Sequence, residues 1–343
     1  MTLLQKAFGF DLKYGGRQIA MIGRQGTRKT TILRAYAENA LARKQPVIWR
    51  ARKFKDQWHL IPSEPNVISP EGFDISFWEA PQGTLDRKER TFNIQKFTST
   101  RQIMSLLQPG LNVLIEPNLP RPWLAVWWVY FLDMLVRREK YPSIRVCFDE
   151  ILDVFPSSTM LKSDAYGELM PNFAARFYDL RRFGIDMMMV GHNSGDIHFD
   201  IRGAFTGIIY LPGAQAIKHW KVSNRALDAL RDGRCIVELP GKYVETSMNI
   251  PDDRQPTSYI SHTMDDDNWH PDPAFKDASR YLLNDRLVKK YRYWNEPRKV
   301  KIEKKEGPGA QKGEGIPPIN SSKITRKRGK KAVPPAKRGG RYE

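Results

Sequence analysis

The stretch from Gly23 to Thr30 limits the folds open to this chain more than any other part of it. It reads GRQGTRKT, follows an apolar run at Gln18–Ile22 and leads into a helical pattern. A glycine-rich loop between a strand and a helix, ending in Lys-Thr, is the pattern of a phosphate-binding P-loop, or Walker A motif. The backbone amides of such a loop and the N-terminus of the next helix surround the phosphates. The chain is therefore predicted to have a P-loop fold.

Each residue type in this loop has an expected task. The Lys29 ammonium would reach the β- and γ-phosphates of ATP, and the Thr30 hydroxyl would bind Mg²⁺. The predicted nucleotide-binding residues are Gly23, Gly26, Thr27, Arg28, Lys29, Thr30 and Thr31. Arg28 departs from the pattern, because a glycine usually precedes the lysine, and Gly26 is expected to supply the backbone freedom instead. The alternative is a strand-loop-helix connection that merely contains glycine and lysine.

A second motif ends the apolar run Ile144–Phe148, which is followed by Asp149 and Glu150. In a Walker B strand the first acid holds Mg²⁺, directly or through water, and the adjacent glutamate acts on the attacking water as general base. Acids at a strand end also commonly cap the next helix, which is the simpler interpretation of this pair. Because each motif follows its own strand, we predict that the chain hydrolyses ATP at a site formed by Lys29, Asp149 and Glu150.

Apolar runs of strand length alternate with helical patterns through the first 250 residues. Strands are predicted at Gln18–Ile22, Val47–Trp49, Asn112–Ile115, Ile144–Phe148, Ile185–Val190 and Gly207–Leu211, and helices at Thr30–Ala42, Trp123–Arg138 and Tyr166–Phe183. This alternation is typical of an α/β fold with a mainly parallel central sheet covered on both faces. A hairpin at Arg234–Leu239 and Lys242–Thr246 is expected at the sheet edge. Strands between the two motifs, and the paired acids, favour the RecA-like P-loop NTPases over nucleotide kinases and GTPases.

The order of motifs after the acid pair resembles the FtsK/HerA superfamily of DNA translocases. The matching positions are Asp149, Glu150 and Asp153, the Arg-x-x-Gly-Ile run from Arg181 to Ile185, the polar end of the next strand at His192, and the closing hairpin from Leu230 to Cys235. The resemblance covers about Gln18 to Thr246 and implies an ATP-driven motor that acts on double-stranded DNA.

The resemblance also implies roles for four polar residues. His192 stands where family members usually carry a glutamine, so it or Asn193 is expected to bond the γ-phosphate or the attacking water as a sensor. Arg181 matches the family arginine that acts on a neighbouring subunit's nucleotide, and Arg182 is its nearest substitute. A loop histidine without chemistry and ordinary exposed helix arginines are the simpler alternatives.

Members of this superfamily work as rings, usually hexamers, with ATP between subunits. A short ATPase core with a small C-terminal extension resembles most closely the ATPases that package viral genomes, which implies capsid or membrane vertex proteins as further partners. A plasmid or conjugation motor is the first alternative. A DNA-binding virion protein, with a P-loop degenerate through Arg28, is the second.

Positive charge is concentrated at the end of the chain. The formal net charge is +18, and residues 297–343 hold 15 Lys or Arg against 4 Glu. A basic excess of this kind is expected of proteins that handle nucleic acid. We predict a RecA-like domain over 1–250, a linker and helix over 251–296, and a disordered basic tail over 297–343. The tail would contact DNA phosphates, anionic lipid or an acidic capsid surface, or would simply be solvated. The basic stretch Arg50–Lys55 is either a candidate DNA-gripping loop or an ordinary solvated loop.

Targeting and redox features are few. The first residues carry Lys6, Asp11 and Lys13 and do not form a secretory signal. The most apolar stretch, Trp123–Leu132, is about half as long as a bilayer span requires and is predicted to be a core helix. Cys147 and Cys235 lie in apolar runs and are expected to be packing thiols in a reducing compartment. The expected location is the host cytoplasm, with association with the virion left open.

Overall fold

The computed structural model describes residues 16–51, 57–72, 75–81, 86, 88–117, 119, 121–138, 140–151, 177–197, 199–218, 220–248 and 258–264. The chain divides into two units, Met1–Pro297 and Arg298–Glu343, and every described residue belongs to the first. Several predicted features lie outside the described residues. They are the helix expected within 251–296, the basic tail, Asp153 and the start of the Tyr166–Phe183 helix.

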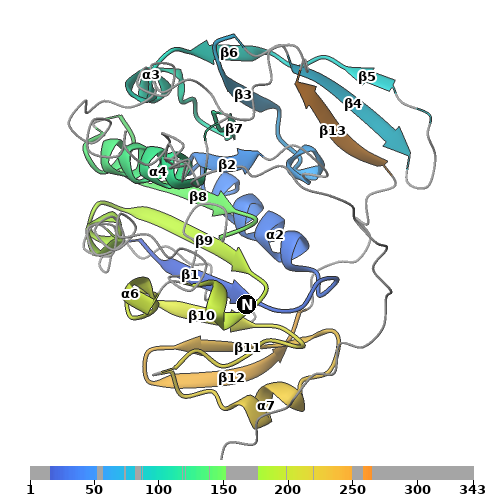
Figure 1. Cartoon of the computed structure of the whole chain (residues 1–343), viewed down its shortest axis with the longest axis vertical. Coiled ribbons are helices and arrows are strands. Elements are labelled where there is room, and N and C mark those ends of the chain that lie inside the picture. Colours follow the sequence, from blue (N-terminus) through green and yellow to red (C-terminus); the bar gives the residue numbers. More distant parts are fainter. Residues whose placement is uncertain are drawn as a thin grey trace, which may run out of the picture. The chain divides into compact units, whose positions relative to one another are not determined.

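In this part of the chain, ten strands form one sheet in the order β12-β11-β10-β1-β9-β8-β2-β7-β3-β6 (Figure 1). The strands are β1 (Gln18–Ile22), β2 (Val47–Ala51), β3 (Pro65–Pro70), β6 (Ile94–Phe97), β7 (Leu111–Ile115), β8 (Ile144–Phe148), β9 (Ile185–Gly191), β10 (Gly207–Tyr210), β11 (Arg234–Leu239) and β12 (Lys242–Ser247). Neighbours from β10 to β6 are parallel, while β10-β11 and β11-β12 are antiparallel. The predicted α/β, RecA-like fold and its edge hairpin are confirmed, and β9 lies between β1 and β8.

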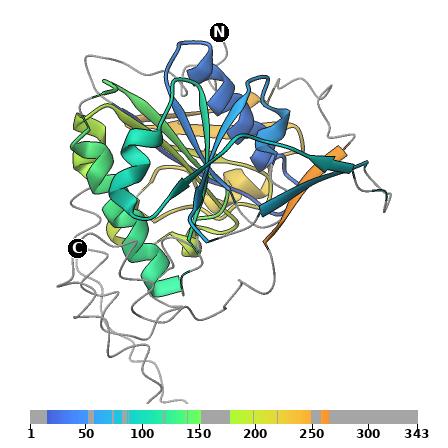
Figure 2. The same ribbon diagram turned by 90° about the horizontal axis from the view of Figure 1, so that it is seen from above.

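The sheet is buried on both faces, which is why its central strands read as continuous apolar runs. In β1, Ile19 and Met21 pack on one face while Ala20 and Ile22 pack on the other. Helix α2 (Lys29–Leu41) covers the first face, and α3 (Thr100–Leu106), α4 (Arg121–Val136) and α6 (Phe199–Arg202) cover the second (Figure 2). A short helix, α7 (Asn224–Asp228), lies beside the hairpin (Figure 1).

Helix α4 is the predicted tryptophan-rich core helix. Trp127, Trp128 and Phe131 are fully buried, and the Trp128 and Phe148 ring centroids lie 4.8 Å apart in an edge-on contact. Among the described helices, none has both the length and the apolar character needed to cross a membrane. Burial also raises the pKa of the Cys147 thiol and raises that of Cys235 to about 12, in agreement with packing roles for both cysteines.

A second, antiparallel sheet was not predicted from the sequence. It has the order β13-β4-β5 and is formed by β4 (Ile75–Pro81), β5 (Lys88–Arg90) and β13 (Ser258–Met264). Strand β13 lies inside residues 251–296, for which only a linker and a helix were predicted. Phe77 of β4 joins this sheet to the core, with its ring centroid 5.9 Å from that of Trp58 and 4.9 Å from that of Phe92.

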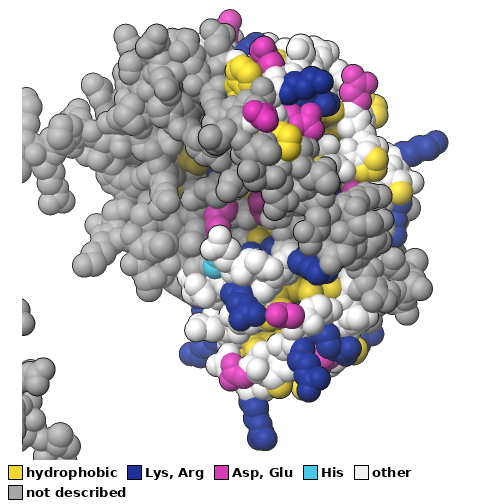
Figure 3. Space-filling view, turned by 90° about the vertical axis from the view of Figure 1, so that its right-hand side faces the viewer, with side chains coloured by type: hydrophobic (Ala, Val, Ile, Leu, Met, Phe, Trp, Pro, Cys, Tyr) yellow, Lys and Arg dark blue, Asp and Glu magenta, His cyan; other side chains and the backbone are white. Residues whose placement is uncertain are grey.

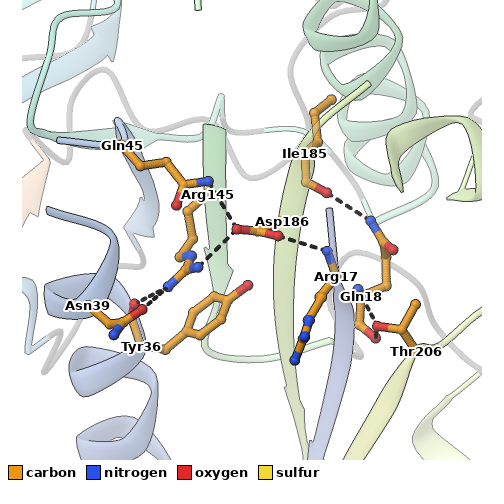
Figure 4. Close-up of polar contacts among 9 residues, drawn as sticks. All are labelled: Arg17, Gln18, Tyr36, Asn39, Gln45, Arg145, Ile185, Asp186 and Thr206. Atoms are coloured by element: carbon orange, nitrogen blue, oxygen red, sulfur yellow. Dashed lines mark hydrogen bonds and ion pairs between the residues drawn. The ribbon is translucent and has the colours of Figure 1, made fainter. Parts of the chain in front are cut away.

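A buried ion pair joins β8 to β9 near the start of both strands (Figure 4). Arg145 Nη2 lies 2.9 Å from Asp186 Oδ2, and the two side chains are 0% and 1% exposed. The backbone N–H of Arg17 and the Gln45 amide also donate to Asp186, at 2.7 and 3.0 Å. On the other side, Arg145 Nη1 donates to the Tyr36 carbonyl at 2.7 Å, and the guanidinium lies 3.9 Å from the centre of the Tyr36 ring. The network ties α2, β1, β8 and β9 together.

Replacing Arg145 with methionine should destabilise the fold strongly. The change leaves Asp186 buried without its cation, and breaking a buried pair in this way costs about 3–5 kcal/mol. Equilibrium denaturation of the full chain measures the loss. Arg137→Met is the matched control, because Arg137 pairs with Asp133 at 2.8 Å but is 63% exposed, so its loss should stay below about 1 kcal/mol. Equal losses in the two variants would contradict a structural role for the network.

Candidate functional site

The sheet order brings three loops to one edge. Strands β1, β9 and β8 are neighbours and run parallel, so the segments after Ile22, Gly191 and Phe148 emerge side by side. The crevice beyond the carboxyl ends of parallel strands is where α/β proteins bind their ligands. The P-loop, His192 and the Asp149–Glu150 pair therefore share this edge.

The backbone of the P-loop has two residues in the left-handed region, Gly26 with φ of 82° and Arg28 with φ of 66°. Arg28 is the N-cap of α2. It thus adopts the conformation that the usual glycine would take, at a cost of roughly 1–2 kcal/mol for a non-glycine residue. The expectation that Gly26 replaces that glycine is incomplete, because both residues take positive φ.

Gly23 is required at its position by packing. A Cβ atom there would lie 2.6 Å from Leu211 Cβ and 2.9 Å from the Thr27 hydroxyl. That hydroxyl donates to the Arg24 carbonyl at 2.8 Å, which braces the loop from within. Gly23 and Thr27 therefore fix the shape of the loop through close packing and an internal hydrogen bond.

The Lys29 ammonium lies inside the curve of the loop. Its Nζ donates to the carbonyls of Gly23 and Arg24, both at 2.7 Å, and lies 3.2 Å from His192 Nδ1. Lys29 is only 8% exposed. The cation is thus held at the mouth of the P-loop, next to the residue that ends β9.

Thr30 and Asp149 are in direct contact. The Thr30 hydroxyl lies 3.1 Å from Asp149 Oδ1 and 3.3 Å from Oδ2. A hydroxyl and a carboxylate are the hard oxygen ligands that Mg²⁺ takes, and this ion usually keeps water and substrate phosphates as its other ligands. The described residues contain no group of three or more His, Cys, Asp or Glu side chains able to hold a metal. The Thr30–Asp149 pair therefore suits a phosphate-bound Mg²⁺ rather than an all-protein metal site.

His192 bridges Lys29 and Glu150. Its Nε2 lies 3.2 Å from Glu150 Oε2, while its Nδ1 faces Lys29. An ammonium only donates, so Nδ1 must accept and Nε2 carries the hydrogen that goes to Glu150. The other carboxylate oxygen, Glu150 Oε1, is buried and has no hydrogen-bond partner among the described residues. Its lone pairs are available to a water molecule.

The remaining predicted residues are placed differently. Thr31 is partly buried on α2, and Asn193 is exposed beside His192. Arg181 and Arg182 are exposed just before β9, at the opposite end of that strand from His192. The structure does not bring these two arginines to the P-loop of their own chain.

The basic loop proposed to grip DNA is corrected in part. Arg50 belongs to β2, is fully buried and pairs with Glu116, so it is not a solvated loop residue. Residues 52–55 of that loop lie outside the described part. The sequence signal was an arginine at the end of an apolar strand, where burial demands a carboxylate partner.

No protein-family model and no curated protein matches this chain. Among solved structures, it is similar to the genome packaging NTPase B204 of Sulfolobus turreted icosahedral virus 2 in complex with ATPγS, at 12% identity and a TM-score of 0.40, over 69% of this chain and 98% of that one. It is also similar to the bacterial conjugative coupling protein TrwB, at 12% identity and a TM-score of 0.45, over 74% and 93%. Similarity at this level does not carry a substrate or partner from one protein to another.

Proposed function

We propose that this chain is a P-loop ATPase of the FtsK/HerA type that uses ATP hydrolysis to move double-stranded DNA. The observation that supports hydrolysis is the convergence of three contacts at one sheet edge. Thr30 meets Asp149, Lys29 meets His192, and His192 meets Glu150. A phosphate-binding loop, a metal-binding pair and a candidate general base are the parts that phosphoryl transfer to water needs.

The proposed reaction assigns each side chain one task. Lys29 would hold the β- and γ-phosphates, and Thr30 with Asp149 would hold Mg²⁺, which would supply positive charge beside the phosphate oxygens. Glu150 accepts a proton from water as the water oxygen bonds to the γ-phosphorus. The bond from that phosphorus to the oxygen of ADP breaks, which gives ADP and phosphate. His192 donates to Glu150 and so orients its carboxylate.

The proposal for DNA rests on charge and on the sequence resemblance. On the face drawn in Figure 3, Lys and Arg side chains stand among Asp and Glu side chains instead of forming one basic patch. Most of the excess positive charge belongs to residues 297–343, with 15 Lys or Arg against 4 Glu. Contacts of these cations with phosphates would release counterions, so DNA binding should weaken steeply as salt rises.

A ring of subunits and viral genome packaging are the finer parts of the proposal. Arg181 and Arg182 are exposed and lie away from the P-loop of their own chain, so a role at a nucleotide would require a neighbouring subunit. Plasmid or conjugative transfer is the alternative setting for the same motor. Capsid or membrane vertex proteins would be partners only in the packaging setting.

ATP hydrolysis by the full chain should rise several-fold when linear double-stranded DNA is added. A phosphate-release assay at low and high salt measures this, and the stimulation should disappear at high salt as the phosphate contacts are screened. If the rate of hydrolysis does not change with DNA, the proposed ATPase activity stands but the proposed action on DNA is contradicted. Absence of Mg²⁺–ATP binding would favour the alternative of a DNA-binding virion protein with a degenerate P-loop.

A further inference from the structure

A largely buried charged cluster of Arg50, Glu116 and Trp128 lies beside the proposed active site, and none of its three members was predicted to act there. Arg50, near the end of β2, is fully buried. Its Nε lies 2.6 Å from Glu116 Oε2 and its Nη2 lies 2.8 Å from Glu116 Oε1. Trp128 of α4 donates its indole N–H to the same Oε2 at 3.0 Å. The Glu116 carboxylate is thus held from two sides, by a fork of two guanidinium nitrogens and by an indole.

The third nitrogen of the guanidinium reaches the active site. Arg50 Nη1 donates to the backbone carbonyl of Glu150 at 2.9 Å. The next residue, Ile151, donates its backbone N–H to the Val190 carbonyl of β9 at 2.8 Å. The peptide group between Glu150 and Ile151 is therefore fixed at both ends, its C=O by β2 and its N–H by β9. Fixing this peptide fixes the direction in which the Glu150 side chain leaves the backbone.

The chemistry of the cluster favours arginine at this position. The planar guanidinium serves the two carboxylate oxygens and the carbonyl at once, which the compact ammonium of lysine cannot do. Buried ion pairs are weak evidence for stability, because well-packed apolar residues of similar volume are often as stabilising or more so. A pair at the end of the strand that carries the proposed general base has a second use, which is to hold that base in place.

We propose that Arg50, itself held by Glu116 and Trp128, is a positioning residue for Glu150. The inference rests on the proposed hydrolytic role of Glu150. A displacement of about 1 Å at a reacting group can lower the rate on the order of 100-fold. Nucleotide binding is assigned to Lys29 and Thr30, whose side chains bond the carbonyls of Gly23 and Arg24, His192 and Asp149. Loss of the contact between Arg50 and the Glu150 carbonyl should therefore lower the turnover number and leave the affinity for ATP largely unchanged.

The test compares Arg50→Lys with the unchanged full chain. We expect kcat to fall about 10- to 100-fold, while KM for ATP and the Kd for Mg²⁺–ATP stay within about threefold. Trp128→Phe, which keeps an aromatic ring and removes one hydrogen bond, should give a smaller fall in kcat of about 3- to 10-fold. Arg90→Lys is the matched control, because Arg90 is 47% exposed and pairs with Glu79 at 2.8 Å on the small sheet, and it should leave kcat unchanged.

Opposite results would overturn the inference. If Arg50→Lys lowers the melting temperature but keeps the wild-type kcat per folded molecule, the cluster is structural only. If Arg50→Lys does not fold, Trp128→Phe is measured instead. An unchanged kcat in Trp128→Phe would likewise show that the cluster is structural only. A wild-type chain that binds ATP without hydrolysing it would remove the proposed function and the positioning role together. A hydrolysing wild type with an unaffected Arg50→Lys removes only the positioning role.

Discussion

The Glu150→Gln variant should bind Mg²⁺–ATP as tightly as the unchanged protein while its turnover falls by about 10³-fold. Glutamine keeps the shape of the side chain and still accepts from His192 Nε2, which lies 3.2 Å from the carboxylate. It cannot take a proton from water at neutral pH, so the chemical step alone is lost. Single-turnover hydrolysis, together with equilibrium binding of a fluorescent ATP analogue, separates the two effects.

A matched variant guards against a general effect of removing a negative charge. Glu245→Gln makes the same chemical change on the edge strand β12, where Glu245 pairs with Arg234 in an exposed ion pair. Its turnover should equal that of the unchanged protein. If Glu150→Gln kept a kcat within about tenfold of wild type, the general base would have to be another residue.

Lys29→Ala should lose both ATP binding and hydrolysis. The ammonium would supply the main positive charge that the protein offers to the β- and γ-phosphates. Removing one preorganised donor to a charged group in such a site costs about 10²–10³ in rate, and weaker ground-state binding adds to that loss. Titration with the nucleotide analogue and a phosphate-release assay at saturating ATP measure the two losses separately.

Lys29 also donates hydrogen bonds to the carbonyls of Gly23 and Arg24. A loss of ATP binding in Lys29→Ala must therefore be distinguished from damage to the loop. An unchanged melting temperature without nucleotide would show that the loop and fold survive. Lys242→Ala removes a lysine from the exposed edge strand and serves as the control. Robust ATP binding by Lys29→Ala would contradict the assignment of this loop as the phosphate site.

Sequence patterns predicted the central sheet well because its strands are continuous apolar runs. The bounds of β1 and β8 agree with the prediction, and the hairpin of β11 and β12 follows from the Pro240-Gly241 turn. Strands β3 to β6 and β13 were not predicted. They are short or carry polar residues, and β13 pairs with β4 from a distant part of the sequence. Tertiary partners decide such pairings more than local pattern does.

In the candidate site, the residues that belong to local sequence motifs were predicted, whereas a contact between distant strands was not. Lys29, Thr30, Asp149, Glu150 and His192 were all identified from motifs at strand ends, and the structure brings them together. Their functional roles stay predictions. The contact of Arg50 with the Glu150 carbonyl could not be predicted, since it depends on β2 lying next to β8.

The position of β9 in the sheet has a mechanical consequence. This strand is hydrogen-bonded on both sides, to β1 and to β8, so it can neither stretch nor bend easily. Its seven residues span roughly 23 Å at about 3.3 Å per residue. His192 follows one end, and Arg181 with Arg182 precedes the other. Sliding β9 along its axis would break the hydrogen bonds to both neighbours, so the sheet keeps a fixed separation between the histidine end and the arginine end of this strand.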